Sequence, residues 1–186
     1  MAVVHASGAG WRLARRLGGL LVALVLLGAT GGVARAQRPV HRVALGGGSG
    51  LSVGSAQGTA VSRRTPFFVE ASYRQRSSEA LQPWFGVGLR AEVESRASVA
   101  VVPAAQLERQ VGPVSVRPLL ALPFFFAPFS LLGAELGLDV AYELGGGLAC
   151  VLGLRLDGFF WGSDLPEGSA LVMANAMLGV EMTWEQ

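Results

Sequence analysis

The chain has 186 residues, of which 51% are hydrophobic, 15% are charged and 26 are glycine. A soluble domain usually carries about 25% charged residues, so this composition is poor in solvating groups. It argues against disorder, which needs charge to keep a chain expanded, and against a nucleic-acid partner, which needs cations to neutralise phosphates. The length allows one ordinary domain.

The N-terminal segment has the pattern of an export signal. Residues 1–16 contain three arginines and no acidic residue, and the stretch 17–29 is apolar. This stretch is too short to cross a hydrocarbon core of roughly 30 Å comfortably. It is followed at 34–36 by the small-x-small pattern that signal peptidase recognises, which predicts cleavage before Gln37. We therefore expect a signal peptide over 1–36 and one domain over 37–186, with an uncleaved anchor helix as the alternative.

The rest of the chain alternates between apolar residues and small or polar ones. Since successive side chains of a strand point to opposite faces, alternation with period two predicts β-strands. The pattern is strong at 85–94, 132–142, 148–157 and 172–184, and weaker at 39–48, 66–76, 97–108 and 114–125. These stretches predict about eight strands of about ten residues, longer than the usual soluble strand of roughly 5–6.

The composition of the two faces indicates which one is outside. The polar positions hold mostly glycine and alanine with scattered arginine, glutamate and aspartate, which would solvate an exterior poorly but fill a narrow lumen well. The apolar face must then meet lipid, and only a closed barrel lets strands do so without unpaired backbone groups. We expect an all-β, antiparallel, up-and-down transmembrane β-barrel of about eight strands. A soluble periplasmic ligand-binding barrel is the alternative.

Aromatic residues fall near the ends of the predicted strands, as in the two aromatic girdles of a membrane barrel. One predicted rim contains Tyr73, Trp84, Phe85, Tyr142 and Trp184. The opposite rim contains Phe67, Phe68, Phe124, Phe125, Phe126, Phe129, Phe159, Phe160 and Trp161. Among these, the residues expected to anchor the barrel at the membrane interface are Tyr73, Trp84, Tyr142, Trp161 and Trp184.

The C-terminal residues carry a resemblance to a known family. In the stretch 179–184, Gly179 is followed by the apolar Met182 three positions later and by the aromatic Trp184 two positions after that. This pattern resembles the C-terminal assembly signal of the small outer-membrane β-barrels of Gram-negative bacteria, such as the OmpA and OmpX types. The resemblance implies a cell outer membrane location, the barrel-assembly machinery as a partner, and outer-membrane lipid and lipopolysaccharide as surroundings. We expect a monomer.

Two features conflict with regular strands. Pro103, Pro118 and Pro123 fall inside predicted strands, and each removes a ladder hydrogen bond, which predicts bulges or shortened strands. The stretch 119–138 is apolar enough to suggest a transmembrane helix, but Pro123 and Pro128 in its middle disfavour one.

Loops and turns follow from the same pattern. An even number of strands places both termini on the periplasmic side, so 49–64 and 161–168 become extracellular loops. The glycine-rich run 46–50 lacks the Lys-Ser/Thr of a phosphate-binding loop and is interpreted as a strand end and flexible loop. The three glycines at 145–147 predict a tight turn.

No group of residues predicts a catalytic, cofactor or metal site. His41 is the only histidine after the expected cleavage site, and a catalytic histidine needs a nucleophile and an orienting carboxylate within reach. Some barrels of this size modify lipid A, and the deacylase type carries a His-x-Ser-Asn run on a late strand. Here the only late asparagine is Asn175, between two alanines. A lipid A-modifying enzyme remains the alternative to a non-enzymatic role.

The inward-facing charges are the one constellation with functional meaning. Across a narrow lumen, Arg74, Arg90, Arg117 and Arg155 would face Glu92, Glu94, Glu108, Glu135, Asp139, Glu143, Asp157 and Glu181. These charges would either gate a small pore or fill the interior as a salt-bridged plug. Because about eight strands leave a lumen that side chains nearly close, and because buried charges must be paired, we expect the plug. The predicted role is structural, or interaction at the cell surface.

Overall fold

The computed structural model describes residues 39–56, 59–76, 83–94, 97–163, 165 and 169–185. The predicted signal peptide lies outside these residues. None of the described segments is a helix long and apolar enough to cross a membrane. The strands are β1 (Val40–Ala56), β2 (Thr59–Arg64), β3 (Phe68–Arg76), β4 (Trp84–Glu92), β5 (Ser98–Gln106), β6 (Arg109–Val111), β7 (Val114–Ala121), β8 (Phe124–Ala127), β9 (Leu131–Gly145), β10 (Leu148–Gly162) and β11 (Leu171–Glu185).

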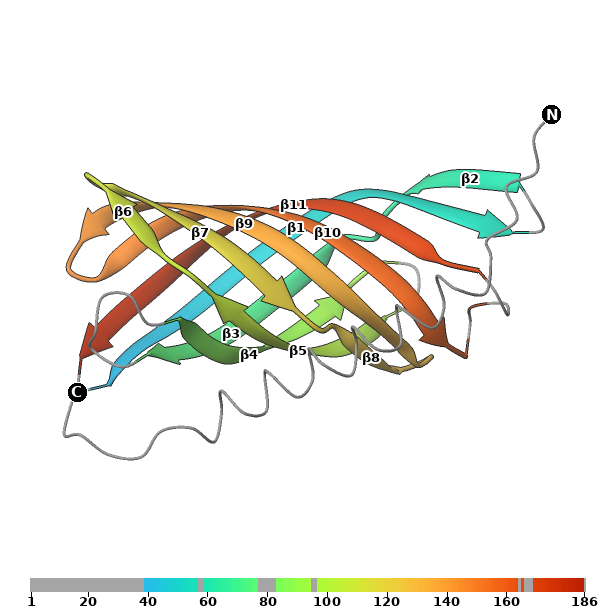
Figure 1. The fold of residues 1–186 in the computed structure, drawn as a ribbon, viewed down its shortest axis with the longest axis horizontal. Helices are drawn as coiled ribbons and strands as arrows, with labels where there is room; N and C mark the ends of the chain where they lie inside the picture. The colour runs from blue at the N-terminus through green and yellow to red at the C-terminus, as the bar shows by residue number, and fades with distance from the viewer. Residues whose placement is uncertain are drawn as a thin grey trace. The chain divides into compact units, whose positions relative to one another are not determined.

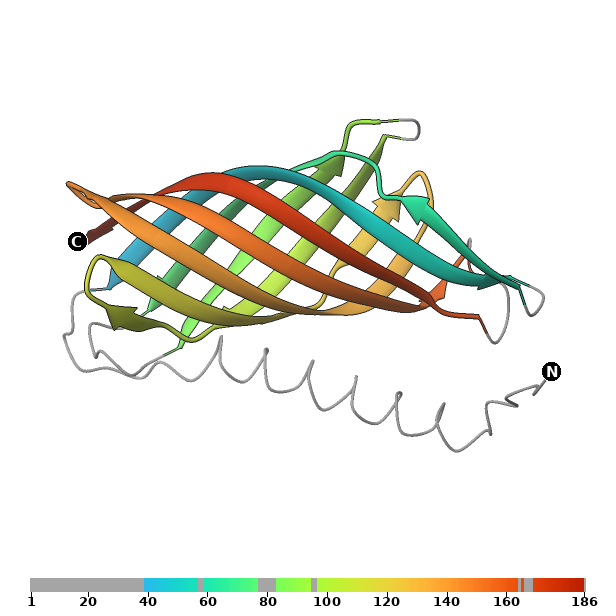
Figure 2. The ribbon, with the colours of Figure 1, turned by 90° about the horizontal axis from the view of Figure 1, so that it is seen from above.

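The strands form one closed antiparallel barrel (Figures 1 and 2). β1 pairs with β11 and β3, and pairing continues through β4 and β5 to β7 and β8. β7 and β8 both pair with β9, which pairs with β10 and so returns to β11. Because β7 and β8 together occupy one position between β5 and β9, the barrel has eight strand positions. The predicted fold class is confirmed.

The fifth position, which β7 and β8 share, is interrupted where the prolines predict irregularity. β7 ends at Ala121 and β8 begins at Phe124, so Pro123 falls in the break. Pro103 and Pro118 stay inside β5 and β7, and their carbonyl oxygens each accept a backbone hydrogen bond of 3.0 Å, from Leu122 and Leu107 respectively. The stretch 119–138 is therefore strand, break and strand rather than a helix.

The loop predicted over 49–64 is wrong. β1 continues to Ala56 and pairs with β2, so this segment is a β-hairpin at the end of the barrel opposite the start of β1 and the end of β11 (Figure 1). The glycine-rich run 46–50 lies inside β1 rather than at its end. Its glycines allow close packing, because a Cβ atom on Gly48 or Gly50 would overlap the backbone of β11.

The turn predicted at 145–147 is confirmed. It joins β9 to β10, and its three glycines have φ values of +102°, +62° and +81°. Such positive values favour glycine over other residues. In the stretch 161–168, β10 extends to Gly162, and most of the rest lies outside the described residues.

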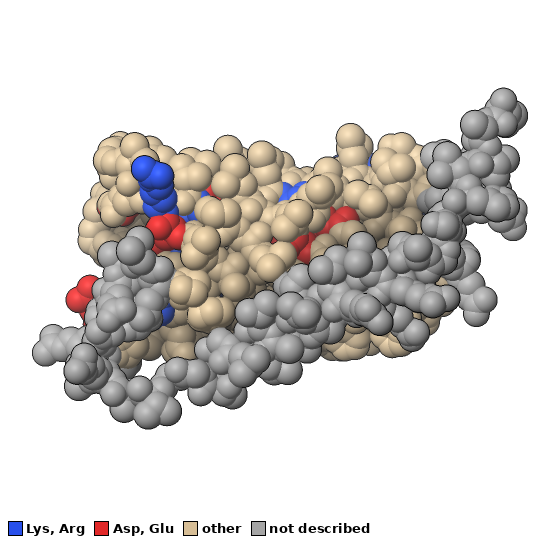
Figure 3. All heavy atoms as spheres, viewed as in Figure 1, with Lys and Arg blue, Asp and Glu red and all other residues tan. Residues whose placement is uncertain are grey.

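The orientation of the two faces agrees with the alternation. On β10, Leu152, Leu154 and Leu156 are about half exposed, whereas Arg155 and Asp157 are buried. Figure 3 shows that the described part of this face of the molecule is mostly uncharged. The exposed aliphatic residues of the last three strands are here called the outer belt: Leu136, Leu138, Val140, Leu144, Leu148, Leu152, Leu154, Leu156, Val172, Leu178 and Val180.

Candidate functional site

The barrel interior contains equal numbers of buried positive and negative side chains among the described residues. None of them is more than 6% exposed. Such charges are tolerated away from water only when they are paired and hydrogen-bonded. The ten residues are Arg42, Arg74, Arg90, Arg117 and Arg155, with Glu70, Glu135, Asp139, Asp157 and Glu181.

Arg90 on β4 is the centre of a first cluster. Its Nε donates to Glu70 Oε2 at 2.8 Å, and its Nη2 donates to Glu135 Oε2 at 2.6 Å. Its Nη1 lies 3.4 Å from Asp157 Oδ1. Glu135 and Asp157 are directly opposite each other on β9 and β10, so their like charges need a shared cation. Arg90 supplies it from across the lumen, and Arg155 Nε adds a second contact to Glu135 Oε1 at 3.1 Å.

A second cluster lies nearer the end of the barrel where β1 begins and β11 ends. Arg117 Nη1 donates to both carboxylate oxygens of Glu181 at 2.7 Å, and its Nε donates to Glu108 Oε1 at 2.7 Å. Arg42 Nη2 donates to Glu108 Oε1 at 2.9 Å. Each carboxylate is thus shared by two guanidinium groups, since Arg42 also lies 3.6 Å from Glu181.

Trp84 belongs to this second cluster, and its predicted role as a membrane-interface anchor is wrong. Its side chain is 0% exposed, with the guanidinium carbons of Arg42 and Arg76 at 3.8 and 4.6 Å from its ring. Its indole N–H donates to Glu108 at 2.8 Å. The physical reason is strand parity, because Trp84 and Arg90 occupy even positions of β4 and therefore face the same way.

Gln106 joins the two clusters. Its Oε1 accepts from Arg42 Nη1 at 3.2 Å, and its Nε2 donates to Asp139 Oδ2 at 2.7 Å. Asp139 in turn pairs with Arg155 at 2.5 Å, which belongs to the first cluster. The sequence pattern did not single out Gln106, Arg42 or Glu70, although all three share the inward parity of their strands.

Three acidic residues predicted to line the lumen lie at the barrel ends instead. Glu94, beyond the end of β4, forms an exposed ion pair with Arg64. Glu143 is exposed and accepts a hydrogen bond of 2.9 Å from Gln110. Glu92 is half-buried and accepts a hydrogen bond from Ser98.

The far end of the interior is apolar. Phe159 is fully buried and packs edge-on against Phe125, with ring centroids 5.7 Å apart. Phe129 stacks on Phe125 at 6.2 Å. Phe68 is also buried, so several aromatics expected in the outer girdle instead face inward. Phe67, Phe124, Phe126 and Trp161 remain exposed at this end.

Between the apolar end and Trp84, side chains fill the lumen of the described barrel. A small cavity of about 20 Å³ lies in the charged part of the interior. A volume of this order holds roughly one water molecule. The arrangement is a plug of ion pairs with an aromatic layer at its far end, rather than an open channel.

Four of the predicted interface anchors are exposed as expected. Tyr73, Tyr142, Trp161 and Trp184 have 39%, 53%, 56% and 36% of their surface exposed. His41 stacks between Tyr73 and Trp184, and its Nδ1 lies 2.7 Å from the Tyr73 hydroxyl. The two aromatic rings cover the imidazole, so that His41 is only 8% exposed.

The residues compared with a lipid A deacylase are not brought together. Asn175 lies in the interior, where its Nδ2 donates to Asp157 at 2.9 Å. Thr65 donates to its amide oxygen at 2.8 Å. Within the described chain, no serine or carboxylate is hydrogen-bonded to His41, so the geometry that the deacylase comparison needs is not assembled.

Comparison with known proteins supports the architecture. No family model matches the sequence, and no curated protein matches it either. The structure is similar to that of Neisserial surface protein A, at 12% identity and a TM-score of 0.53, over 76% of this chain and 96% of that chain. The chain has the fold of the small outer-membrane β-barrels.

Other solved structures also match over most of the chain. The N-terminal β-barrel domain of Pseudomonas aeruginosa OprF matches at 13% identity and a TM-score of 0.47, over 81% of this chain and 100% of that chain. Ail, the attachment invasion locus protein of Yersinia pestis, matches at 10% identity and a TM-score of 0.45, over 78% of this chain and 98% of that chain.

Proposed function

We propose that this outer-membrane-type barrel is an integral protein of the Gram-negative outer membrane that serves as a rigid, non-conducting scaffold with a structural or surface-interaction role. The observation that carries the proposal is the pairing of an exposed aliphatic belt with a charge-balanced, filled interior. A soluble barrel would reverse these faces, because exposed leucine is unfavourable in water and a charge loses its hydration when it is buried.

The dimensions of the last three strands suit a membrane. β9, β10 and β11 have 15 residues each. At about 3.3 Å per residue and a tilt of about 40°, such a strand spans about 38 Å along the barrel axis. An apolar band of about 25 Å therefore fits between the two ends. The still longer β1, with 17 residues, carries its hairpin with β2 beyond this band.

The filled interior supports a role other than transport. A solute would have to displace Arg90 and Arg117 from their carboxylates and then pass the Phe125–Phe159 contact. Each buried ion pair that is broken leaves an uncompensated charge in a low-dielectric interior. The ordinary state of this barrel is therefore closed.

The proposed surface role uses the end of the barrel opposite the start of β1 and the end of β11. There the β1–β2 hairpin carries Arg63 and Arg64, which are exposed, beside Glu94. With both termini in the periplasm, this end faces the cell exterior, where lipopolysaccharide and external ligands are the available partners. Insertion would use the barrel-assembly machinery, through Gly179, Met182 and Trp184. The uninterrupted aliphatic belt favours a monomer.

Membrane extraction and gel migration test the location. The mature protein should fractionate with outer membranes and, after detergent extraction, migrate differently before and after heating, as folded membrane barrels do. Recovery as a detergent-independent periplasmic monomer would contradict the proposal and favour a ligand-binding barrel.

Two further measurements separate the alternatives in function. Planar-bilayer recordings should show no steady channel activity, and stable channels would contradict a closed lumen. Lipid A from a deletion strain should be chemically unchanged, and an altered acylation pattern that the wild-type gene restores would favour the enzyme.

A further inference from the structure

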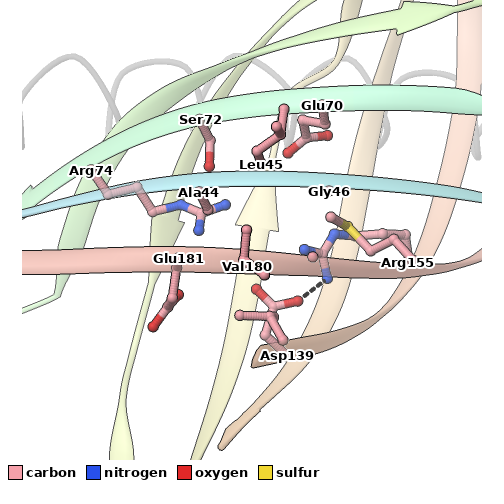
Figure 4. A pocket seen from close by; sticks show the side chains of 13 residues that line it. Ala44, Leu45, Gly46, Glu70, Ser72, Arg74, Asp139, Arg155, Val180 and Glu181 are labelled. Carbon is pink, nitrogen blue, oxygen red and sulfur yellow. Dashed lines mark ion pairs between the residues drawn. The ribbon is translucent and has the colours of Figure 1, made fainter. Parts of the chain in front are cut away.

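The small cavity in the barrel interior is lined by charged and polar side chains together with apolar ones. Figure 4 shows side chains from several strands pointing into it, including Ser72 and Arg74 of β3. Three carboxylates and one further guanidinium complete the polar part of the lining: Glu70, Asp139, Glu181 and Arg155. The remaining lining is small or apolar. A polar cavity of this size is suited to a water molecule, whereas an apolar one stays empty.

Arg74 differs from the other buried arginines. Arg42, Arg90, Arg117 and Arg155 each form at least one ion pair with a carboxylate. Arg74 forms none with another residue of the described chain, and its Nε is buried without a hydrogen-bond partner there. Its side chain is only 6% exposed. In Figure 4 the one ion pair drawn joins Arg155 to Asp139, while the Arg74 guanidinium lies between the surrounding acids.

We propose that this cavity is a binding site for one structural water molecule, which accepts a hydrogen bond from Arg74 Nε and donates to the neighbouring carboxylates. Leaving a buried donor unpaired is strongly unfavourable, and a bridging water of this kind is nearly as good as a direct hydrogen bond. The water would complete the network at the only buried arginine of the described chain that lacks an ion pair.

The chemistry of the lining favours a neutral ligand over an ion. An anion would accept from Arg74 but would meet Glu70, Asp139 and Glu181, which outnumber the guanidinium groups of the lining. A cation would suit the carboxylates but would meet Arg74 and Arg155. Water accepts and donates at once, and it leaves the balance of buried charges unchanged.

A crystal structure of the mature protein, at a resolution that shows ordered water, tests the site directly. Crystals should be soaked in parallel in chloride and in bromide. The proposal expects one water oxygen within hydrogen-bond distance of Arg74 Nε and of at least one carboxylate, with no anomalous peak after the bromide soak. An empty cavity, a direct Arg74–carboxylate ion pair or a bromide peak would each overturn it.

A matched pair of variants tests the same site in solution. Ser72→Ala removes the hydroxyl and leaves room for the water, whereas Ser72→Val fills the space with methyl groups. If the water satisfies Arg74, the valine variant should melt several degrees below the alanine variant, despite its larger apolar side chain. A valine variant that melts at the same temperature or higher would refute the proposal.

Discussion

Replacing Arg90 with methionine should remove the largest single contribution of the interior network to stability. Arg90 contacts Glu70, Glu135 and Asp157, whose exposures are 4%, 0% and 0%. Removing one partner of a buried ion pair costs about 3–5 kcal/mol, because the remaining charge is left uncompensated. Since three carboxylates lose a shared cation and Glu135 keeps only Arg155, we expect Arg90→Met to lower the free energy of unfolding by about 4–5 kcal/mol. Urea unfolding of the refolded barrel in lipid vesicles measures this change.

The exposed Arg64–Glu94 pair supplies a matched control. Arg64→Met removes the same group from an ion pair that solvent screens, so its effect should not be measurable. Adding Glu70→Gln and Asp157→Asn to Arg90→Met should recover much of the lost stability, because these changes remove the uncompensated charges. Equal unfolding of Arg90→Met and Arg64→Met would refute the argument that paired interior charges hold the barrel together.

Three further predictions concern the two ends of the barrel. Phe159→Ala leaves a cavity in the aromatic layer and should lower the free energy of unfolding by about 3–5 kcal/mol, measured by urea titration. Gly147→Ala should lower the melting temperature more than Gly146→Ala, since both have positive φ but only the first would push a Cβ atom into a backbone carbonyl of β11. Glu108, beyond the end of β5, is partly desolvated, which raises its pKa, but the adjacent guanidinium groups outweigh this and hold the pKa below 4.5. A carboxylate with a lowered folded-state pKa stabilises the fold above its unfolded pKa. Stability from Glu108 should therefore be constant at neutral pH and lost on acidification below 4.5, and Glu108→Gln should reduce that acid dependence in urea titrations at several pH values.

The architecture was predictable because the last three strands carry an unusually regular alternation. On β10 and β11, every second residue over most of the strand is apolar and exposed. A shift of the pairing by one residue would turn these apolar residues inward and the charged residues outward, so the charges are inside in one register only. The inward positions of Arg90 and Arg155 followed from the same parity. The prolines located the interruption at Pro123 because a missing backbone N–H has a local and predictable effect.

The details of the site were less predictable because they depend on contacts between distant strands. The glycine run at 46–50 suggested a loop, whereas in the barrel it lets β1 approach β11 closely, which a single sequence does not reveal. Trp84 fits an interface anchor by residue type and an interior residue by parity, and these two signals conflict. What decides between them is the pair of arginines and the Glu108 carboxylate around its indole, and these groups lie on other segments of the chain.

The C-terminal aromatic has two separable roles. Trp184 is predicted to complete the assembly signal, and in the structure it also stacks on His41, its direct cross-strand neighbour, with ring centroids 5.6 Å apart. This contact lies at the seam where the first and last strand positions of the barrel meet. Trp184→Ala should therefore leave export intact but reduce insertion, because it removes both an interfacial aromatic and a seam contact. The measurement is the ratio of heat-modifiable barrel to protease-sensitive periplasmic chain.

Two companion variants identify which role of Trp184 matters. Leu178→Ala shortens a side chain of the same strand that is 70% exposed in the outer belt, and it should insert almost as well as the wild type. His41→Ala breaks the seam stack but leaves the C-terminal pattern complete. If the assembly signal dominates, His41→Ala should insert normally and only destabilise the folded barrel, by about 0.5–1.5 kcal/mol for the lost ring contact. If His41→Ala reduces insertion as much as Trp184→Ala, closure of the seam is the step that Trp184 serves. Wild-type insertion of Trp184→Ala would mean that the C-terminal pattern is a consequence of strand alternation alone, since neither role would then be needed.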